Sequence, residues 1–166
     1  MLEAVVRDNL NLSAKRTMVV TQPLKVTVVG GLDRRQVSIP DFPNEPNKGE
    51  HEIVLESPFY IEKSDFKEAM VTGYRRLCPG QTVGLRHAGL VIELVDVVKN
   101  NGEVEEITVK AIPVEKTAKP KAFIHWVAEG IPIEVRMYSR LFKHKVRSVS
   151  SYEVELIFYQ QFYLDP

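Results

Sequence analysis

The most restrictive feature of the sequence is a predicted β-hairpin near its middle. Two segments rich in β-branched residues, 90–98 and 104–112, flank the turn Lys99-Asn100-Asn101-Gly102. An Asn-Gly pair supplies the left-handed backbone conformations that a two-residue hairpin turn requires, so we expect the two segments to pair antiparallel. Strict alternation would place Val91 and Val97 on the same face of the first strand.

Helical patterns are confined to two short segments. Residues 2–12 carry an apolar stripe at helical spacing, which predicts a short helix that packs on something else. Residues 64–70 open with Ser64, a good helix cap, and predict one or two helical turns. Between them, residues 40–50 hold three prolines, two asparagines and a glycine, so we expect a long loop there. That loop is either a functional element or a plain surface crossover.

Most of the remaining chain has the composition of short strands between turns. The predicted strands are residues 18–29, a return strand at 36–39, two strands within 52–62, and strands at 122–128, 131–138 and 152–166. Strands do not alternate with long helices, so a parallel α/β sheet is a poor fit. We therefore predict an all-β fold: an antiparallel β-barrel with one or two lobes and a short N-terminal helix.

Composition excludes several classes of protein. The 166 residues contain 22 Lys and Arg against 22 Asp and Glu, so any nucleic-acid contact must come from local clustering. A single cysteine, Cys78, excludes an internal disulfide and a cysteine-based zinc site. No run of about 18 apolar residues could cross a membrane. The first twenty residues carry charges that a signal peptide lacks, so we expect a cytoplasmic protein.

Enzyme signatures are absent from the sequence. No glycine-rich phosphate loop follows a predicted strand, and the four histidines have no metal-ligand spacing. His125 lies between apolar neighbours and is predicted to be a hydrogen-bonded core residue. We therefore assign no catalytic residue, no metal site and no cofactor to this chain.

A basic stretch covers residues 73–89. It contains Arg75, Arg76, Arg86 and His87 and no acidic residue. Arginine forks suit phosphates and base edges, and the ring of Tyr74 could stack on an unpaired base. Two interpretations remain open: a contact for single-stranded RNA, or a solvated hairpin. A second basic cluster lies within residues 135–147, and its alternative interpretation is a solvated strand end.

A series of short motifs occurs in the order found in a known family. They are Arg16-Thr-Met-Val-Val20, Pro40-Asp-Phe-Pro-Asn44, Ile61-Glu-Lys-Ser-Asp-Phe66, Gly73-Tyr-Arg-Arg-Leu77, Gly84-Leu-Arg-His-Ala-Gly89, Lys119-Pro-Lys-Ala-Phe-Ile-His-Trp-Val127 and Glu134-Val-Arg-Met-Tyr-Ser-Arg-Leu-Phe142. This set, over about residues 2–145, resembles the C-terminal anticodon-binding region of glutaminyl-tRNA synthetases, the eukaryotic type more than the bacterial one. The sister glutamyl enzymes share the architecture.

The resemblance implies which residues contact the anticodon of a glutamine tRNA. Arg16 would contact an anticodon base, and Pro43 with Asn44 would line a base pocket. Arg75 and Arg76 would hold the third base and its phosphate. Arg86 would contact the first base. These positions agree with the basic stretch, because the unpaired bases of a loop are the readable part of an RNA.

The chain also departs from the family pattern. Bacterial members have an arginine where this chain has Gly84 and a glutamine where it has Gly73, so side-chain contacts at these positions do not carry over. The catalytic domain that uses ATP has no counterpart in the sequence, and residues beyond 145 diverge. We expect the end of a helical connector at residues 1–15, the anticodon-binding barrel at 16–145 and a divergent tail at 146–166.

The resemblance implies tRNA as the partner, with a separate catalytic domain or a multi-synthetase assembly as further partners, and no membrane. Two alternatives keep the fold without this function. One is a protein-interaction β-barrel, and the other is a barrel that binds ribosomal RNA, since a ribosomal protein family shares this architecture.

Overall fold

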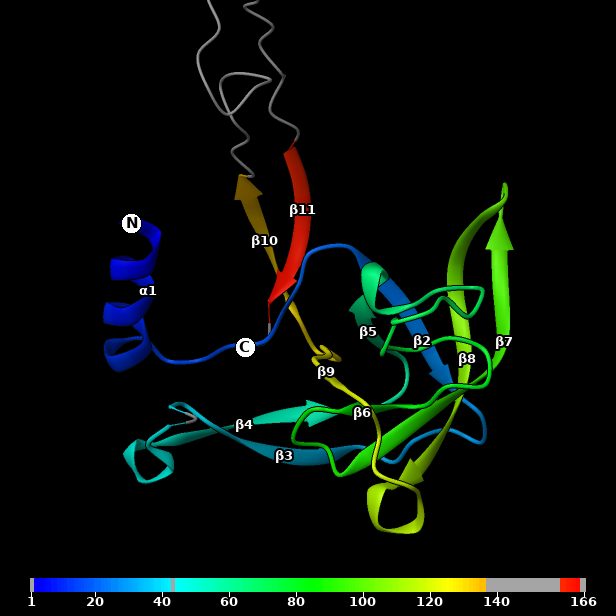
Figure 1. Ribbon diagram of the computed structural model, residues 1–166, viewed down its shortest axis with the longest axis horizontal. Helices are drawn as coiled ribbons and strands as arrows, with labels where there is room; N and C mark the ends of the chain where they lie inside the picture. Colours follow the sequence, from blue (N-terminus) through cyan, green and yellow to red (C-terminus); the bar gives the residue numbers. More distant parts are fainter. Residues whose placement is uncertain (1, 43, 137–158, 165–166) are drawn as a thin grey trace, which may run out of the picture.

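A six-stranded sheet that closes on itself forms the centre of the molecule (Figure 1). The computed structural model describes residues 2–42, 44–136 and 159–164. The strands in spatial order are β5 (Phe59–Glu62), β2 (Pro23–Val28), β8 (Glu103–Pro113), β7 (Leu90–Asn100), β6 (Val83–Leu85) and β9 (Phe123–Ile124). Closure comes from Tyr60 and Val127, whose backbone N–H groups donate to each other's carbonyl oxygens at 2.7 and 2.9 Å. The predicted all-β barrel is thus confirmed.

The sheet is mixed, whereas the sequence predicts antiparallel neighbours only. Strand β2 pairs parallel to β8, with Val26 opposite Ile107, and β6 pairs parallel to β9, with Gly84 opposite Phe123. The remaining pairs, β2–β5, β6–β7 and β7–β8, are antiparallel. The parallel pairs join segments far apart in the chain, which no local pattern encodes.

The central hairpin has the predicted turn. Asn101 and Gly102 link β7 to β8 with φ angles of 52° and 85°. Strict alternation of faces is wrong, however, because a bulge at Val95 shifts the register between Leu94 and Asp96. The bulge exposes Val95 and turns Val97 toward the core. The far end of this hairpin projects from the barrel (Figure 1).

A second hairpin lies beside the barrel (Figure 1). Strand β3 (Arg35–Pro40) pairs antiparallel with β4 (Glu50–Leu55), so residues 36–39 do not return along β2 as predicted. Val37 and Ile53 of this hairpin are buried in the common core. The predicted loop at 40–50 is the connection within the hairpin and includes the short helix η1 (Pro46–Lys48).

A third sheet joins the beginning and end of the described chain. Strand β11 (Tyr159–Leu164) pairs antiparallel with β1 (Val19–Val20) on one side and with β10 (Ile131–Arg136) on the other. The strand signal within residues 152–166 is thereby confirmed for β11. The second basic cluster falls outside the described residues from position 137 to 147.

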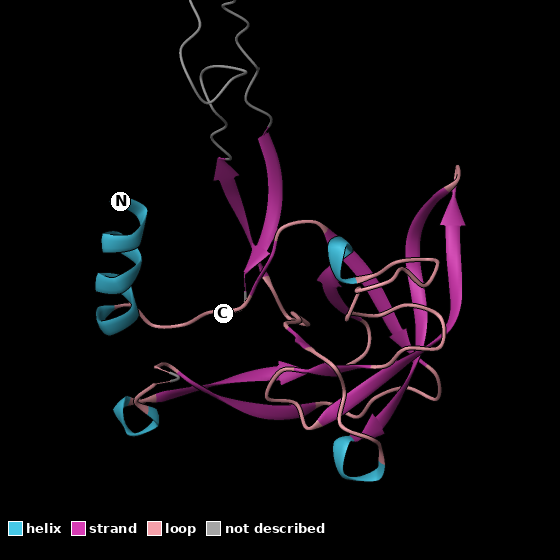
Figure 2. Ribbon diagram, in the orientation of Figure 1, coloured by secondary structure: helices cyan, strands magenta, loops and turns pink. Residues whose placement is uncertain are grey.

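Helical structure is peripheral, as Figure 2 shows. Helix α1 (Leu2–Ser13) confirms the predicted N-terminal helix, and its Val5 and Leu12 side chains are exposed. The predicted helical turns at residues 64–70 are wrong. Only η2 (Lys63–Asp65) forms there, because Lys67 donates its N–H to the Leu77 carbonyl rather than to a preceding turn. The third short helix is η3 (Val114–Lys116).

The core lies inside the barrel and under the β3–β4 hairpin. Side chains from each of the six barrel strands enter it, among them Val26, Phe59, Leu85 and Ile107. Trp126, just after β9, is the largest fully buried side chain. Its indole N–H donates to the backbone carbonyl of Arg86 at 3.0 Å, so the core is tied directly to the basic stretch.

Candidate nucleic-acid interface

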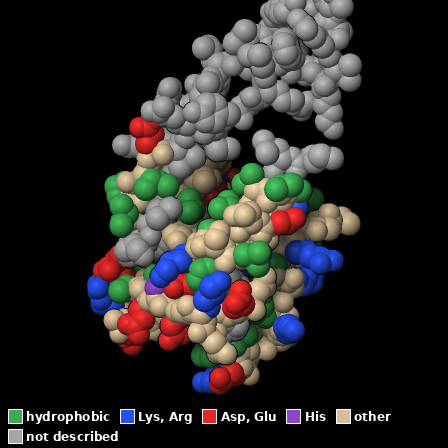
Figure 3. Space-filling view, turned by 90° about the vertical axis from the view of Figure 1, so that its left-hand side faces the viewer, with side chains coloured by type: hydrophobic (Ala, Val, Ile, Leu, Met, Phe, Trp, Pro, Cys, Tyr) green, Lys and Arg blue, Asp and Glu red, His purple; other side chains and the backbone are tan. Residues whose placement is uncertain are grey.

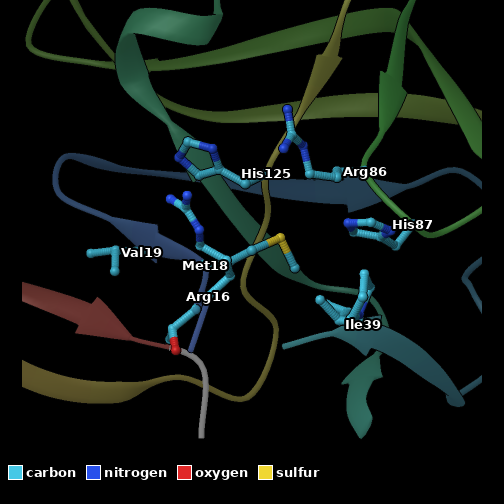
Figure 4. Close-up of a pocket in the computed structure, with 9 residues that line it drawn as sticks. Arg16, Met18, Val19, Ile39, Arg86, His87 and His125 are labelled. Atoms are coloured by element: carbon cyan, nitrogen blue, oxygen red, sulfur yellow. The ribbon is translucent and has the colours of Figure 1, made fainter. Parts of the chain in front are cut away.

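A recess of about 500 Å³ on the described surface has a basic rim. Arg16, Arg86, His87 and His125 line it, over a floor that includes Ile39. The four basic side chains come from the link before β1, the β6–β7 turn and the residue just after β9, and Ile39 comes from β3. In Figure 4 the Arg16 guanidinium points toward the His125 ring, while Arg86 and His87 stand apart from them. We call this hollow the first recess.

The backbone of Arg86 is held on both sides. Its N–H donates to the Ile124 carbonyl at 2.8 Å, and its carbonyl accepts the Trp126 indole N–H. The turn that follows needs a left-handed residue, and His87 takes that conformation with a φ of 61°. Among the described residues, the Arg86 side chain makes no ion pair. A rigid backbone with a free guanidinium is the arrangement that anion or base recognition requires.

Arg16 is positioned by the backbone of Asp41, a residue whose side chain is buried. Its backbone N–H donates to the carbonyl of Asp41 at 2.8 Å. The Asp41 carboxylate is itself buried and accepts from Lys15 and from Nδ1 of His51, both at 2.8 Å. These two contacts, the Lys15 contact first, hold the pKa of Asp41 below its ordinary value. The guanidinium of Arg16 contacts Asn11 at the end of α1.

The two histidines of the first recess add donors and acceptors. Desolvation, and then the nearby positive charge of Arg86, lowers the pKa of His87, so the neutral ring predominates near neutral pH. His125 is half-buried and faces the recess, so its prediction as a core residue is wrong. Alternation from β9 into the residues that follow it buries Ile124 and Trp126 instead and turns His125 outward.

A second recess, of about 390 Å³, contains Arg75. Gly73, Tyr74, Arg75 and Lys121 line it. Lys121 donates to Oε1 of Gln81 at 3.1 Å, and the Gln81 amide donates to the carbonyls of Tyr74 and Arg76. Within the described part of the chain, Arg75 has no ion-pair partner, so its guanidinium is available to a ligand.

The side chains of Arg76 and Tyr74 are already bound by other groups of the protein. Nε of Arg76 lies 3.0 Å from Oδ1 of the buried Asp65. Burial raises the pKa of Asp65, and Arg76 partly offsets that rise. The Tyr74 hydroxyl donates to the Ser64 carbonyl, and burial raises the Tyr74 pKa to about 12. Lys67 lies 4.7 Å from the centre of the Tyr74 ring, so one face of this predicted stacking ring is covered.

The loop within the β3–β4 hairpin lies next to the end of α1 and borders the first recess at Pro40. Asn44 is exposed and lines a shallow hollow with Asn47 and Lys48. Lys48 anchors the loop by donating to the Leu12 carbonyl at the end of α1. Pro43, the other residue predicted for this base pocket, lies outside the described residues.

The predicted residues therefore form two basic recesses and one neighbouring loop. Arg16 and Arg86 share the first recess, Arg75 lies in the second, and Arg76 is bound to Asp65. Lys121 and His125 were missed, although alternation from residue 121 to 125 could have placed both on the outer face. Figure 3 shows basic side chains and a histidine interspersed with acidic side chains, in keeping with the zero net charge.

Comparison with known proteins identifies the family. A sequence model described as "tRNA synthetases class I (E and Q), anti-codon binding domain" matches residues 14–112. The chain belongs to this family. It is 50% identical over 149 residues to a probable glutamine–tRNA ligase of Drosophila melanogaster and 46% identical over 148 residues to a glutamine–tRNA ligase of Bos taurus. These matches cover 87% of the chain and 19% of each relative.

A bacterial relative is more distant. The glutamine–tRNA ligase of Proteus mirabilis is 36% identical over 151 residues, covering 85% of this chain and 27% of that protein. The resemblance inferred from the motifs is thus confirmed, including its eukaryotic character. The chain spans about a fifth of the length of its animal relatives. No helix in the described residues has the length and apolarity to cross a membrane.

Proposed function

We propose that this chain binds the anticodon loop of a glutamine tRNA and reads its bases. The observation that carries this proposal is the pair of open basic recesses, each with an arginine that lacks an ion pair among the described residues. A loop of unpaired bases offers phosphates and base edges in one small volume, which is what separate arginine sites suit. Membership of the anticodon-binding family, with glutamine–tRNA ligases among its relatives, supports the choice of RNA.

The recesses suggest separate tasks for the arginines. Arg16 and Arg86 would hold one base in the first recess, where Ile39 offers an apolar floor. Arg75, with Lys121 beside it, would hold another base and its phosphate in the second recess. Arg76 would act mainly as a positioning residue, since its Nε is bound to Asp65. Asn44, with Pro43, would contribute from the neighbouring loop.

The test is a titration of the 166-residue chain with two RNAs at two salt concentrations. The RNAs are a glutamine tRNA and the same tRNA with its anticodon replaced. An anticodon reader binds the first more tightly, and both affinities fall as salt rises because phosphate contacts release counterions. Equal affinity for the two RNAs would overturn specific reading and would favour a barrel that binds RNA by shape.

Single variants locate the contact. We expect Arg75→Ala and Arg86→Ala each to weaken binding by about 1–3 kcal/mol, the scale of a good arginine contact to a base. Arg7→Ala is the matched control, because Arg7 is an exposed arginine of α1 outside both recesses. Equal losses in all three variants would indicate a diffuse electrostatic attraction rather than two sites.

This proposal requires no cofactor in the chain. ATP would be used by the catalytic domain of a full-length ligase. That catalytic domain would be linked to the present domain in one chain, and the full-length ligase could in turn join a multi-synthetase assembly. The proposed place of action is the cytoplasm. The present chain would contribute recognition and no chemistry.

A further inference from the structure

An aromatic ring lies on the outer surface between the two recesses. Phe123 is 42% exposed, although it belongs to a strand whose next residue, Ile124, is buried. Its ring rests on the backbone of Gly84, its partner on β6. A Cβ atom at position 84 would lie 2.4 Å from Cδ1 and Cε1 of the ring, so only glycine allows this close contact. One side of the ring is thus fixed while much of its surface meets solvent.

The position of Phe123 relative to the basic residues follows from the strand geometry. Backbone N–H groups of Gly84 and Arg86 donate to the carbonyls of Ala122 and Ile124, which keeps this segment extended against β6. Side chains two residues apart then share a face at a spacing of about 6.6 Å. Lys121 on one side of Phe123 lines the second recess, and His125 on the other side lines the first.

We propose that Phe123 is a stacking platform for an unpaired base of the RNA as it passes from one recess to the other. This inference rests on the proposed function and adds a residue outside the arginine set. An aromatic face stacks on any base, and the cationic side chains that line the two recesses lie on either side of this ring. A phenylalanine ring has no donor or acceptor, so it contributes affinity and does not distinguish one base from another.

Three substitutions at position 123 separate stacking from simple burial. Phe123→Leu keeps an apolar cover over Gly84 but removes the aromatic face, Phe123→Ala removes both, and Phe123→Trp keeps both. We expect the Ala and Leu variants to bind a glutamine-tRNA anticodon stem-loop about 5- to 150-fold more weakly than the wild type, the usual range for a lost base stack. The Trp variant should bind as the wild type does.

Two further readouts identify the mechanism. First, Phe123→Leu should weaken binding of the anticodon-replaced stem-loop by the same factor, and it should leave the salt dependence unchanged because no phosphate contact is lost. Second, 2-aminopurine placed in turn at each anticodon position should be quenched on binding at one position, and that quenching should disappear in the Leu variant. Val98→Ala is the matched control, since Val98 is an exposed strand residue, 46% accessible, in the β7–β8 hairpin.

The outcomes distinguish a failure of the stacking proposal from a failure of the proposed RNA-binding function. If the wild type binds neither RNA, both fail. If the wild type binds and Arg86→Ala weakens binding, but Phe123→Leu and Phe123→Ala bind as tightly as the wild type, the function stands and the stacking platform is wrong. A Phe123→Leu defect seen only with the cognate anticodon would also overturn it, because stacking on phenylalanine does not select a base.

Discussion

Trp126 links the barrel core to the proposed interface, so Trp126→Phe is the most informative single substitution. The indole is fully buried, and its N–H donates at 3.0 Å to the carbonyl of Arg86. Phenylalanine retains a ring in the core but has no N–H. The variant therefore removes the connection between the core and the Arg86 turn while leaving the arginine itself in place.

The expected loss of stability has two parts. Leaving the Arg86 carbonyl without its buried donor costs about 1–3 kcal/mol. Replacing indole by phenyl also leaves about 40 Å³ unfilled, which costs about 1 kcal/mol at 24 cal/mol per Å³. The unfolding free energy should thus fall by about 2–4 kcal/mol, which corresponds to a decrease in Tm of about 4–16 °C for a chain of this length.

The assay combines far-UV circular dichroism with RNA titration below the transition. Tryptophan fluorescence cannot report unfolding, because Trp126 is the single tryptophan and the variant lacks it. Phe59→Leu is the control, since Phe59 is equally buried in the barrel. We expect both variants to lose stability, but only Trp126→Phe to weaken RNA binding through a looser Arg86 turn. A Tm within about 2 °C of the wild type, or equal RNA affinity for both folded variants, would refute this reasoning.

Three further predictions concern the fold. Arg76→Ala leaves Asp65 buried without its cation, so the pKa of Asp65 rises further. A carboxyl whose pKa is raised in the folded state destabilises the fold at a pH where the unfolded chain has it ionised. The stability lost in this variant should therefore be larger at about pH 8 than at about pH 4, as measured by urea unfolding. The opposite trend would contradict the pairing of Arg76 with Asp65. The depressed pKa of Asp41 means that its contacts stabilise the fold above the ordinary carboxyl pKa of about 4 and are lost as pH falls. Asp41→Asn should flatten the acid side of the curve of Tm against pH, whereas unchanged acid sensitivity would disprove this role. Gly102→Ala places a side chain at a φ of 85° with no atom within 4 Å, so strain alone should cost about 1 kcal/mol in thermal unfolding. An unchanged Tm would show that the turn can relax.

Local signals in the sequence predict the elements well where one kind of interaction dominates. The Asn101-Gly102 turn forms as expected because its backbone conformation depends on those two residues alone. Residues 64–70 fail because their backbone groups bond to Leu77, a partner that a helix-cap signal does not include. His125 fails because its chain neighbours Ile124 and Trp126 are buried on the opposite face of an extended segment, so apolar neighbours do not imply that His125 itself is buried.

In the candidate site, too, some features follow from the sequence and others depend on tertiary contacts. Motif order is enough to assign the family and to select Arg16, Arg75 and Arg86 as candidate contacts. Motif order does not distinguish Arg75 from Arg76. In the structure, however, Arg75 lines the second recess, whereas Arg76 is paired with Asp65. The difference arises from Asp65, which lies eleven positions before Arg76 and is brought against it by the Phe66–Leu77 bridge.

By itself, the sequence determines that this protein is an all-β member of the anticodon-binding family, because turn chemistry, alternation and motif order are properties of short stretches of chain. Tertiary structure alone decides how the stretches meet. It closes the barrel through Tyr60 and Val127, pairs two sets of strands in parallel, and places Phe123 on Gly84 between two basic recesses. These contacts join residues 39 to 81 positions apart, and they form only when burial of the common core brings distant segments together.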